Sequence, residues 1–343
     1  MNGAHATPDR HAPWIAHQAR QLLGQRGHAW LLHGPSGLGQ YPLALALARA
    51  WLCQDSGAEG ACGICGSCHA IDVHTHADLC VLMPETTMLA LGWPLSEKAQ
   101  SDIDDKKRKA SKEIRVEAMR DAVEFSQRTS ARGRGKVVLV FPAEQMNTIT
   151  ANALLKTLEE PPGDVKFVLA SESAHQLLPT IRSRCLGHAM QWPDANASQL
   201  WLQGYGLESA SAQRLLMAMG GRPDDALAFV ESGRDAATWS LLPKAVARGD
   251  AGFFKDWTIA QTVDALHKLS HDLMAVHVGA SPRFFSVSDL DTGASFSALS
   301  AWSKSLAQSM RTMDHPFNVG LMLESLVGQA HSALNSAHSN LKR

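Results

Sequence analysis

The first half of the chain alternates short apolar runs with helical patterns. The apolar runs occupy residues 29–33, 79–83, 136–141 and 166–170. Apolar positions recur with a helical period over 43–52, 115–127 and 149–160, the last of which ends sharply at Pro161-Pro162. Alternating strands and helices are typical of a parallel sheet with helices on both faces. We therefore predict an α/β domain over residues 1–188.

The second half carries helical patterns without strand signals. Two short segments, 200–219 and 223–230, are separated by glycine-rich turns, which predicts a small helical lid over 189–236. Farther along, apolar residues recur at nearly 3.6-residue spacing from Trp257 to Leu273, from Phe296 to Leu306 and from Val319 to Leu326. Such stripes usually pack against each other, so we predict an all-α C-terminal domain over 237–343.

Composition narrows the class of protein. The 343 residues are 45% hydrophobic and 19% charged, which suits a multidomain protein with a sizeable core. Its 32 Lys+Arg and 33 Asp+Glu give a net charge of -1, which argues against a free-standing DNA-binding protein. No apolar run approaches the roughly 20 residues of a membrane-spanning helix. Residues 1–14 also lack the apolar core of a signal peptide, so we expect a cytoplasmic protein without membrane contact.

Two charged segments carry less specific signals. Residues 85–112 lack a clear period and place three aspartates directly before a run of lysines and arginine, which is typical of a solvated surface insertion. A basic stretch contains Arg128, Arg132, Arg134 and Lys136. It either faces DNA or forms an exposed helix end and loop.

A glycine-rich turn at 34–39 joins the first apolar run to a helix, as in a phosphate-binding loop. Gly34 and Gly39 stand at its two glycine positions, but Gln40 replaces the lysine and Tyr41 replaces the serine or threonine. The lysine would supply charge to the phosphates, and the small hydroxyl would bind Mg²⁺. Losing both removes several kcal/mol of phosphate and metal stabilisation. The turn is either a coincidence or an inactivated nucleotide-binding loop.

The third apolar run favours the second interpretation. In an active enzyme this strand would end in an acidic residue that helps to hold Mg²⁺. Here it runs into Phe141, and the nearest carboxylate, Glu144, comes too late for that role. We expect a nucleotide-binding fold that neither binds ATP and Mg²⁺ nor hydrolyses nucleotide.

Cysteines gather in one short segment. Cys53, Cys62, Cys65 and Cys68 lie within 16 residues, separated by eight, two and two residues. Four thiolates satisfy tetrahedral zinc, and a site with four protein ligands is structural because no position stays open for chemistry. A redox pair is the alternative for the Cys-x-x-Cys spacing, but four cysteines together favour a structural zinc knuckle over 53–68.

These motifs resemble the delta-prime family of bacterial DNA polymerase III clamp-loader subunits, within the AAA+ superfamily. The resemblance rests on the cysteine knuckle after the glycine loop, on residues 151–162 (Ala-Asn-Ala-Leu-Leu-Lys-Thr-Leu-Glu-Glu-Pro-Pro) and on Ser183-Arg184-Cys185. It covers about residues 14–230. The last two motifs are shared with the ATP-hydrolysing subunit of the same family, from which the defective loop separates this chain.

The resemblance implies a function. Arg184, with Ser183 and Cys185 of the same motif, would be an arginine finger that reaches the γ-phosphate held by a neighbouring ATPase subunit. The chain would form a five-membered ring with gamma/tau and delta subunits through its C-terminal collar. As a rigid, non-hydrolysing member of this DNA-directed DNA polymerase (nucleotidyltransferase) holoenzyme, it would help to load the sliding clamp onto primer-template DNA in the bacterial replisome.

Two other functions are compatible with the motifs. An active ATP-hydrolysing motor subunit would have to bind ATP tightly without the usual lysine. A zinc-dependent nucleic-acid-binding module would show salt-sensitive DNA affinity as a purified chain. The near-neutral charge argues against the second alternative.

Overall fold

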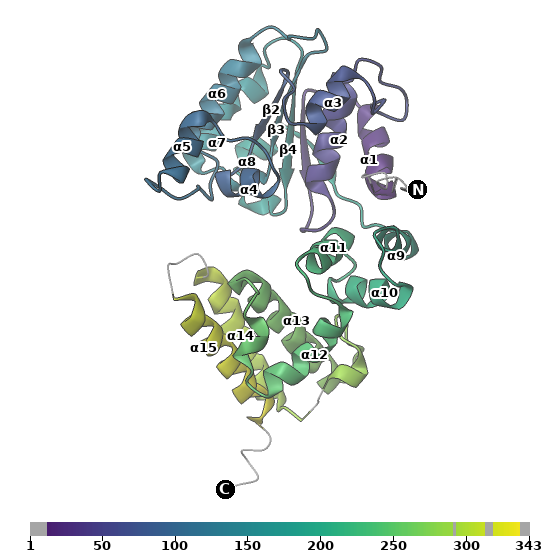
Figure 1. Cartoon of the computed structure of the whole chain (residues 1–343), viewed down its shortest axis with the longest axis vertical. Helices are drawn as coiled ribbons and strands as arrows, with labels where there is room; N and C mark the ends of the chain where they lie inside the picture. Colours follow the sequence, from purple (N-terminus) through teal and green to yellow (C-terminus); the bar gives the residue numbers. More distant parts are fainter. Residues whose placement is uncertain (1–11, 291–292, 313–317, 337–343) are drawn as a thin grey trace, which may run out of the picture. The chain divides into compact units, whose positions relative to one another are not determined.

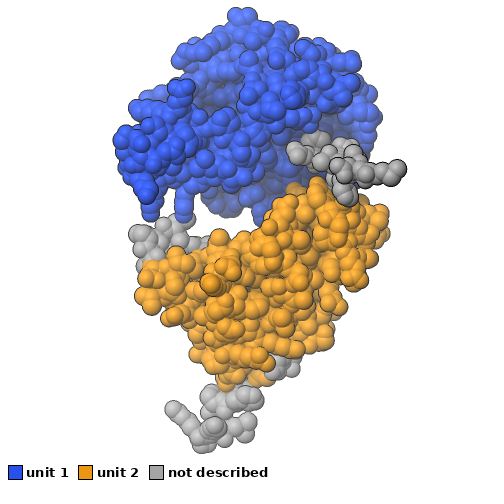
Figure 2. Space-filling model, in the orientation of Figure 1, with its two compact units in different colours: residues 1–193 blue, residues 194–343 orange. Residues whose placement is uncertain are grey.

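The computed structural model describes residues 12–290, 293–312 and 318–336. The chain divides into two compact units, residues 1–193 and 194–343, which Figure 2 colours separately. The predicted division of the second half into a lid over 189–236 and a collar over 237–343 stays a prediction. Within the second unit, one cluster of buried side chains extends from Leu202 to Ala333.

The first unit is built on a five-stranded parallel sheet. Its strands are β1 (Ala29–His33), β2 (Leu79–Leu82), β3 (Lys136–Val140), β4 (Val165–Ser171) and β5 (Leu186–Ala189), in the order β2-β3-β4-β1-β5. The central strands pair in register, with Leu31 opposite Leu169 and Val138 opposite Phe167. These side chains are buried, as expected for strands covered on both faces.

Helices cover both faces of this sheet (Figure 1). They are α1 (Pro13–Leu23), α2 (Gln40–Leu52), α3 (Gly66–Asp72), α4 (Glu85–Ala90), α5 (Glu97–Asp104), α6 (Val116–Gln127), α7 (Thr148–Glu159) and α8 (Pro179–Arg182), with 3₁₀ turns at 143–145 and 174–176. Met119 of α6 and Leu154 of α7 pack on one face, whereas Leu52 of α2 and Ile71 of α3 join Val137 on the other. The α/β prediction is confirmed.

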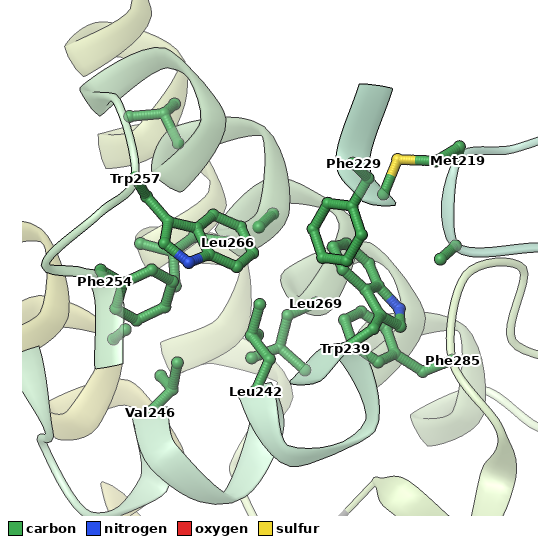
Figure 3. Close-up of a cluster of buried hydrophobic side chains, with 14 of the residues drawn as sticks. Met219, Phe229, Trp239, Leu242, Val246, Phe254, Trp257, Leu266, Leu269 and Phe285 are labelled. Atoms are coloured by element: carbon green, nitrogen blue, oxygen red, sulfur yellow. The ribbon is translucent and has the colours of Figure 1, made fainter. Parts of the chain in front are cut away.

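The regular elements in the described part of the second unit are all helices. It contains α9 (Ala195–Gly204), α10 (Ser209–Ala218), α11 (Pro223–Glu231), α12 (Ala236–Ala247), α13 (Ile259–His277), α14 (Phe296–Thr312) and α15 (Val319–Leu334), with 3₁₀ turns at 251–254 and 287–289. Aromatic rings fill its core: Trp239 stacks on Phe285 at 4.8 Å between centroids, and Phe229 meets Trp239 edge-on (Figure 3). No helix of the described chain is long and apolar enough to span a membrane.

The observed elements depart from the sequence prediction in several places. Helices α1, α3 and α8 and the short edge strand β5 had no prediction. The charged segment 85–112 is not simply a solvated loop, because it contains α4 and α5. It is fastened by Glu85, whose carboxylate accepts hydrogen bonds from Arg108 and from the backbone N–H of Ser111 at 2.8 Å.

Candidate functional site

The glycine loop is closed by the side chain of its own Gln40. The loop follows β1, and Gly39, with φ of 86°, adopts a left-handed conformation directly before α2. The Gln40 side chain turns back into the loop, where its Nε2 donates hydrogen bonds to the carbonyl oxygens of Gly34 (2.8 Å) and Pro35 (2.7 Å). Gln40 is 2% exposed. Its amide donors therefore serve the loop and carry no positive charge for a phosphate.

Tyr41 packs into an aromatic cluster. Its ring stacks on Phe141 at 5.4 Å between centroids, and its hydroxyl accepts a hydrogen bond from Trp93 Nε1 at 2.7 Å. Trp93 comes from the 85–112 segment, is 7% exposed and stacks in turn on His74. Burial raises the pKa of the Tyr41 hydroxyl, although its hydrogen bond with Trp93 works in the opposite direction. The hydroxyl is thus part of a packed interior.

Glu144, the carboxylate nearest the end of β3, has a structural contact. Its Oε1 accepts a hydrogen bond from the backbone N–H of Glu172 at 3.0 Å, just beyond the end of β4. The carboxylate thus joins the segments that follow two neighbouring strands. Phe141 occupies the position directly after β3 and faces Tyr41.

The four knuckle cysteines converge on one point. Their sulfur atoms all lie within 4.8 Å of one another, and Cys53 Sγ is 3.5 Å from Cys62 Sγ and 3.8 Å from those of Cys65 and Cys68. Sulfurs placed about 2.3 Å from a central zinc ion would stand about 3.8 Å apart. The donor set and its spacing fit a closed, tetrahedral metal site, so the structure supports a metal-binding cluster at these residues.

Backbone groups favour thiolates in this cluster. The N–H groups of Cys62, Cys65 and Cys68 point at the sulfurs of Cys53, Cys62 and Cys65, at 3.3 to 3.4 Å. Hydrogen bonds from the backbone of Cys68 and Gln54 lower the pKa of Cys65 to about 6. Burial raises the pKa of Cys68 to about 12. A bound cation would favour the thiolate form of each cysteine.

The loop between α6 and β3 clamps the knuckle to the sheet. Arg134 Nε donates to the Cys53 carbonyl at 2.9 Å, and Arg132 Nη1 reaches Ser67 Oγ at 3.3 Å. This loop is in turn held by Asp78, a fully buried residue before β2. Its carboxylate accepts from the N–H groups of Ala131 (2.7 Å) and Arg132 (2.9 Å) and pairs with the Lys136 ammonium.

The basic stretch consequently has protein partners. Lys136 is buried and lies over the Phe125 ring, with Nζ 3.9 Å from its centroid. Arg128 forms a surface ion pair with Glu124 of the preceding helix. Lys136 is therefore part of the interior, and Arg132 and Arg134 hold the knuckle.

Arg184 lies at the surface between α8 and β5. Its Nε donates to Glu159 Oε1 at 2.7 Å, its Nη2 pairs with the same oxygen, and its Nη1 donates to the Thr180 carbonyl at 2.8 Å. The Arg184 side chain remains 29% exposed. Its hydrogen-bond partners come from α7, α8 and the residue that follows α8. Leu186, two residues farther along, pairs with Trp30 near the start of β1, whereas the glycine loop follows the end of that strand. Arg184 therefore lies near the opposite end of the sheet from the glycine loop of its own chain.

The residues beside Arg184 have local roles. Ser183 follows the last residue of α8, and its hydroxyl donates to the Thr180 carbonyl at 3.2 Å. Cys185 packs against the core that α6 and α7 share with the sheet, and burial raises the pKa of its thiol to about 12. Ser183 is thus a turn residue and Cys185 a packing residue.

Comparison with known proteins agrees with this arrangement. The family model for the DNA polymerase III delta subunit matches residues 15–193, a little more than half of the chain. Subunit delta' of Pseudomonas aeruginosa is 42% identical over 212 residues, which cover 61% of this chain and 58% of that protein. The chain belongs to the DNA polymerase III delta' family.

Other relatives of this delta' chain extend the picture. Subunit delta' of Escherichia coli is 32% identical over 250 residues, covering 69% of this chain and 67% of that protein. The matches span from about half to two thirds of the length of these curated relatives. The solved structure of a DNA polymerase III gamma subunit-related protein of Thermotoga maritima has a similar fold, with a TM-score of 0.50, 17% identity and coverage of 94% of this chain and 99% of that one.

Sequence reasoning missed several residues that organise the delta' site. Trp93 donates a hydrogen bond to Tyr41, and Glu159 accepts one from Arg184. Asp78 holds the loop between α6 and β3, which contacts the knuckle. A lone tryptophan inside a charged, aperiodic segment was the available signal for Trp93. The partners of Asp78 and Glu159 lie 53 and 25 residues away, and a single sequence gives no sign of such pairings.

Proposed function

We propose that this chain acts as a non-hydrolysing clamp-loader subunit that completes the ATP site of a neighbouring subunit. Arg184 would approach the γ-phosphate bound by an ATP-hydrolysing gamma or tau subunit, within a five-membered ring that also contains delta. The ring would load the sliding clamp onto primed DNA in the bacterial cytoplasm. Membership of the delta' family supports this role, and the partly exposed side chain of Arg184 is the observation that carries it.

The closed glycine loop supports the absence of hydrolysis. In an active site of this type, a lysine and a Mg²⁺ ion neutralise phosphate charge. Here the neutral amide of Gln40 is bound to loop carbonyls, and an aromatic ring pair stands where hydroxyl and carboxylate ligands of Mg²⁺ are expected. Binding of ATP would have to break these contacts without gaining an ion pair in return.

The position of Arg184 supports a role in trans. A guanidinium is planar, always charged and suited to bidentate contact with phosphate oxygens. Arg184 makes its hydrogen bonds far from its own glycine loop, yet its side chain remains partly exposed. A cation in this situation can serve a phosphate held by another subunit.

The cysteine knuckle would hold a structural zinc ion. Its four sulfur ligands leave no open coordination position, so the ion would do no chemistry. Bound zinc would fix the segment between α2 and α3 against the loop that contains Arg132 and Arg134. This would help to make the subunit a rigid member against which the active subunits move.

Two measurements test the proposal. A fluorescent-nucleotide titration of the purified chain should show no micromolar ATP affinity; tight binding that Gln40→Ala abolishes would instead identify an active motor subunit. In a loader reconstituted with gamma or tau and delta, Arg184→Ala should lower clamp- and DNA-stimulated ATP turnover at the site it serves by about 10³-fold or more. Arg182→Ala, at an exposed arginine on α8, is the matched control. Unchanged turnover with intact assembly would refute the trans role.

A further inference from the structure

Arg184 and Glu159 form the most specific contact around the proposed finger. Glu159 Oε1 accepts from both Nε and Nη2 of Arg184, so one edge of the guanidinium is bound by a single carboxylate oxygen. On the other side, Nη1 donates to the Thr180 carbonyl at 2.8 Å and lies 3.4 Å from Ser183 Oγ. A guanidinium has five N–H donors. These contacts therefore leave a second Nη2 hydrogen for an acceptor outside them.

The fold gives no local reason for a carboxylate at position 159. Glu159 is the last residue of α7, where the helix dipole disfavours negative charge. The pair is also partly solvent-exposed, at 29% for the Arg184 side chain and 47% for Glu159. Ion pairs that water still reaches contribute little to the stability of a fold. Neither helix formation nor stability of the fold accounts for the pairing.

The orientation of the Arg184 side chain accounts for its pairing with Glu159. A free arginine side chain loses much rotamer entropy when it is immobilised. The contacts with Glu159 and Thr180 restrict that freedom before any phosphate arrives, because they fix two edges of one plane. Such preorganisation matters for a group whose contribution depends on its placement in the transition state.

We propose that Glu159 is the positioning residue for Arg184: it holds the guanidinium by its Nε edge and presents the remaining Nη donor outward. The inference rests on the proposed trans function of Arg184. Glu159 itself touches neither nucleotide nor metal in this scheme. Its side chain acts only through the arginine.

The test uses the reconstituted loader with Arg184→Ala and four further variants of this subunit. Glu159→Ala should lower the stimulated ATP turnover of the served site by about 10- to 100-fold, through kcat with the KM for ATP unchanged. Glu159→Gln keeps an acceptor oxygen and should retain more of the turnover. Glu160→Ala, at the adjacent exposed glutamate, should behave like the unchanged protein. Glu159→Ala combined with Arg184→Ala should be no worse than Arg184→Ala alone.

A second measurement separates this inference from the proposed function. In ¹⁵N-edited NMR of the purified chain, the Nε–H of Arg184 should exchange slowly with water, should lose this protection in Glu159→Ala and should keep it in Glu160→Ala. Three results would each overturn the positioning role. The first is that Glu159→Ala loses the protection of Arg184 but keeps normal ATP turnover. The second is raised turnover in Glu159→Ala, and the third is additive losses of turnover in the double variant. If Arg184→Ala is itself neutral while the NMR protection depends on Glu159, then the proposed trans function fails, and the positioning role fails with it.

Discussion

Tyr41 and Phe141 stack on each other, with ring centroids 5.4 Å apart and an interplanar angle of 28°. In an active nucleotide site, the position of Tyr41 would carry a small hydroxyl and the end of β3 would supply a carboxylate, both for Mg²⁺. In this chain the residues at these two positions instead form one aromatic contact. Trp93 completes it by donating to the Tyr41 hydroxyl.

This relationship predicts an energetic coupling between Tyr41 and Trp93. Tyr41→Phe preserves the stack on Phe141 but leaves the Trp93 N–H without its acceptor. Because Trp93 is 7% exposed, we expect a loss of about 1–3 kcal/mol in urea unfolding of the full chain. In Tyr41→Phe with Trp93→Phe, both partners are gone, so the double variant should be more stable than the sum of the single changes predicts. Strict additivity would show that the hydrogen bond contributes nothing.

The cysteine knuckle predicts one tightly bound zinc ion per chain. Structural zinc supplies about 10–16 kcal/mol to isolated zinc-finger peptides, but this unit has its own sheet and core. We therefore expect a smaller loss, of a few kcal/mol, on chelation or in Cys53→Ser, measured by thermal unfolding with metal analysis. Cys80→Ser, at a cysteine of β2 outside the knuckle, should keep its zinc. A knuckle variant with full zinc content would contradict the assignment.

Most strands and most long helices of this chain could be predicted from periodicity, whereas helix α1, strand β5 and the short helices of the first unit could not. The apolar runs at 29–33 and 136–141 and the stripe from Trp257 to Leu273 correspond to β1, β3 and α13, because burial imposes the pattern directly. Strand β5 has only four residues, Leu186–Ala189, whose exposure leaves no alternation to detect. Helices α4 and α5 depend on a tertiary anchor, the ion pair between Glu85 and Arg108.

The residues of the candidate site could likewise be predicted only in part. The cysteine spacing, the substitutions at Gln40 and Tyr41, and Arg184 are local signals that a single sequence displays. The role of the basic stretch could not be predicted in this way, because the surroundings of Lys136 are set by Asp78, which lies 58 residues away. Charge alone suggested an exposed surface, but burial of the ion pair makes Lys136 part of the interior.

Asp78 predicts a pH-dependent contribution to stability. Burial alone would raise its pKa, but hydrogen bonds from Ala131, Arg132 and Ser130 and the charge of Lys136 outweigh burial and lower it. A carboxyl with a depressed pKa in the folded state contributes stability above its ordinary pKa of about 3.9 and loses it as the pH falls further. Asp78→Asn should therefore cost about 3–5 kcal/mol at pH 7, because it leaves the Lys136 charge buried and unpaired.

The control for Asp78→Asn is Asp164→Asn, which removes the ion pair between Asp164 and Lys166. The Asp164 side chain is 70% exposed. That change should cost no more than about 1 kcal/mol. Thermal unfolding of both variants at neutral and acidic pH checks the sign: the gap between the unchanged protein and Asp78→Asn should narrow below pH of about 4. An equal gap at all pH values would contradict the proposed linkage.

The stability of the second unit should depend on the buried carboxylate of Asp272. It is fully buried on α13 and accepts from the backbone N–H groups of Arg283, Phe284 and Phe285 at 2.9, 2.6 and 2.9 Å. These bonds fix the loop that places the Phe285 ring on Trp239 (Figure 3).

Asp272→Ala deprives three N–H groups of their acceptor, which should cost about 1–3 kcal/mol of stability for each group that stays buried. Urea unfolding should show a loss of about 3 kcal/mol or more, with Asp272→Asn between it and the unchanged protein because the amide keeps one oxygen. Glu324→Ala, at an exposed residue of α15, should stay within about 0.5 kcal/mol. If Asp272→Ala unfolds like this control, the loop is held instead by the Phe285–Trp239 stack and by the hydrogen bond from Trp239 Nε1 to the Phe284 carbonyl.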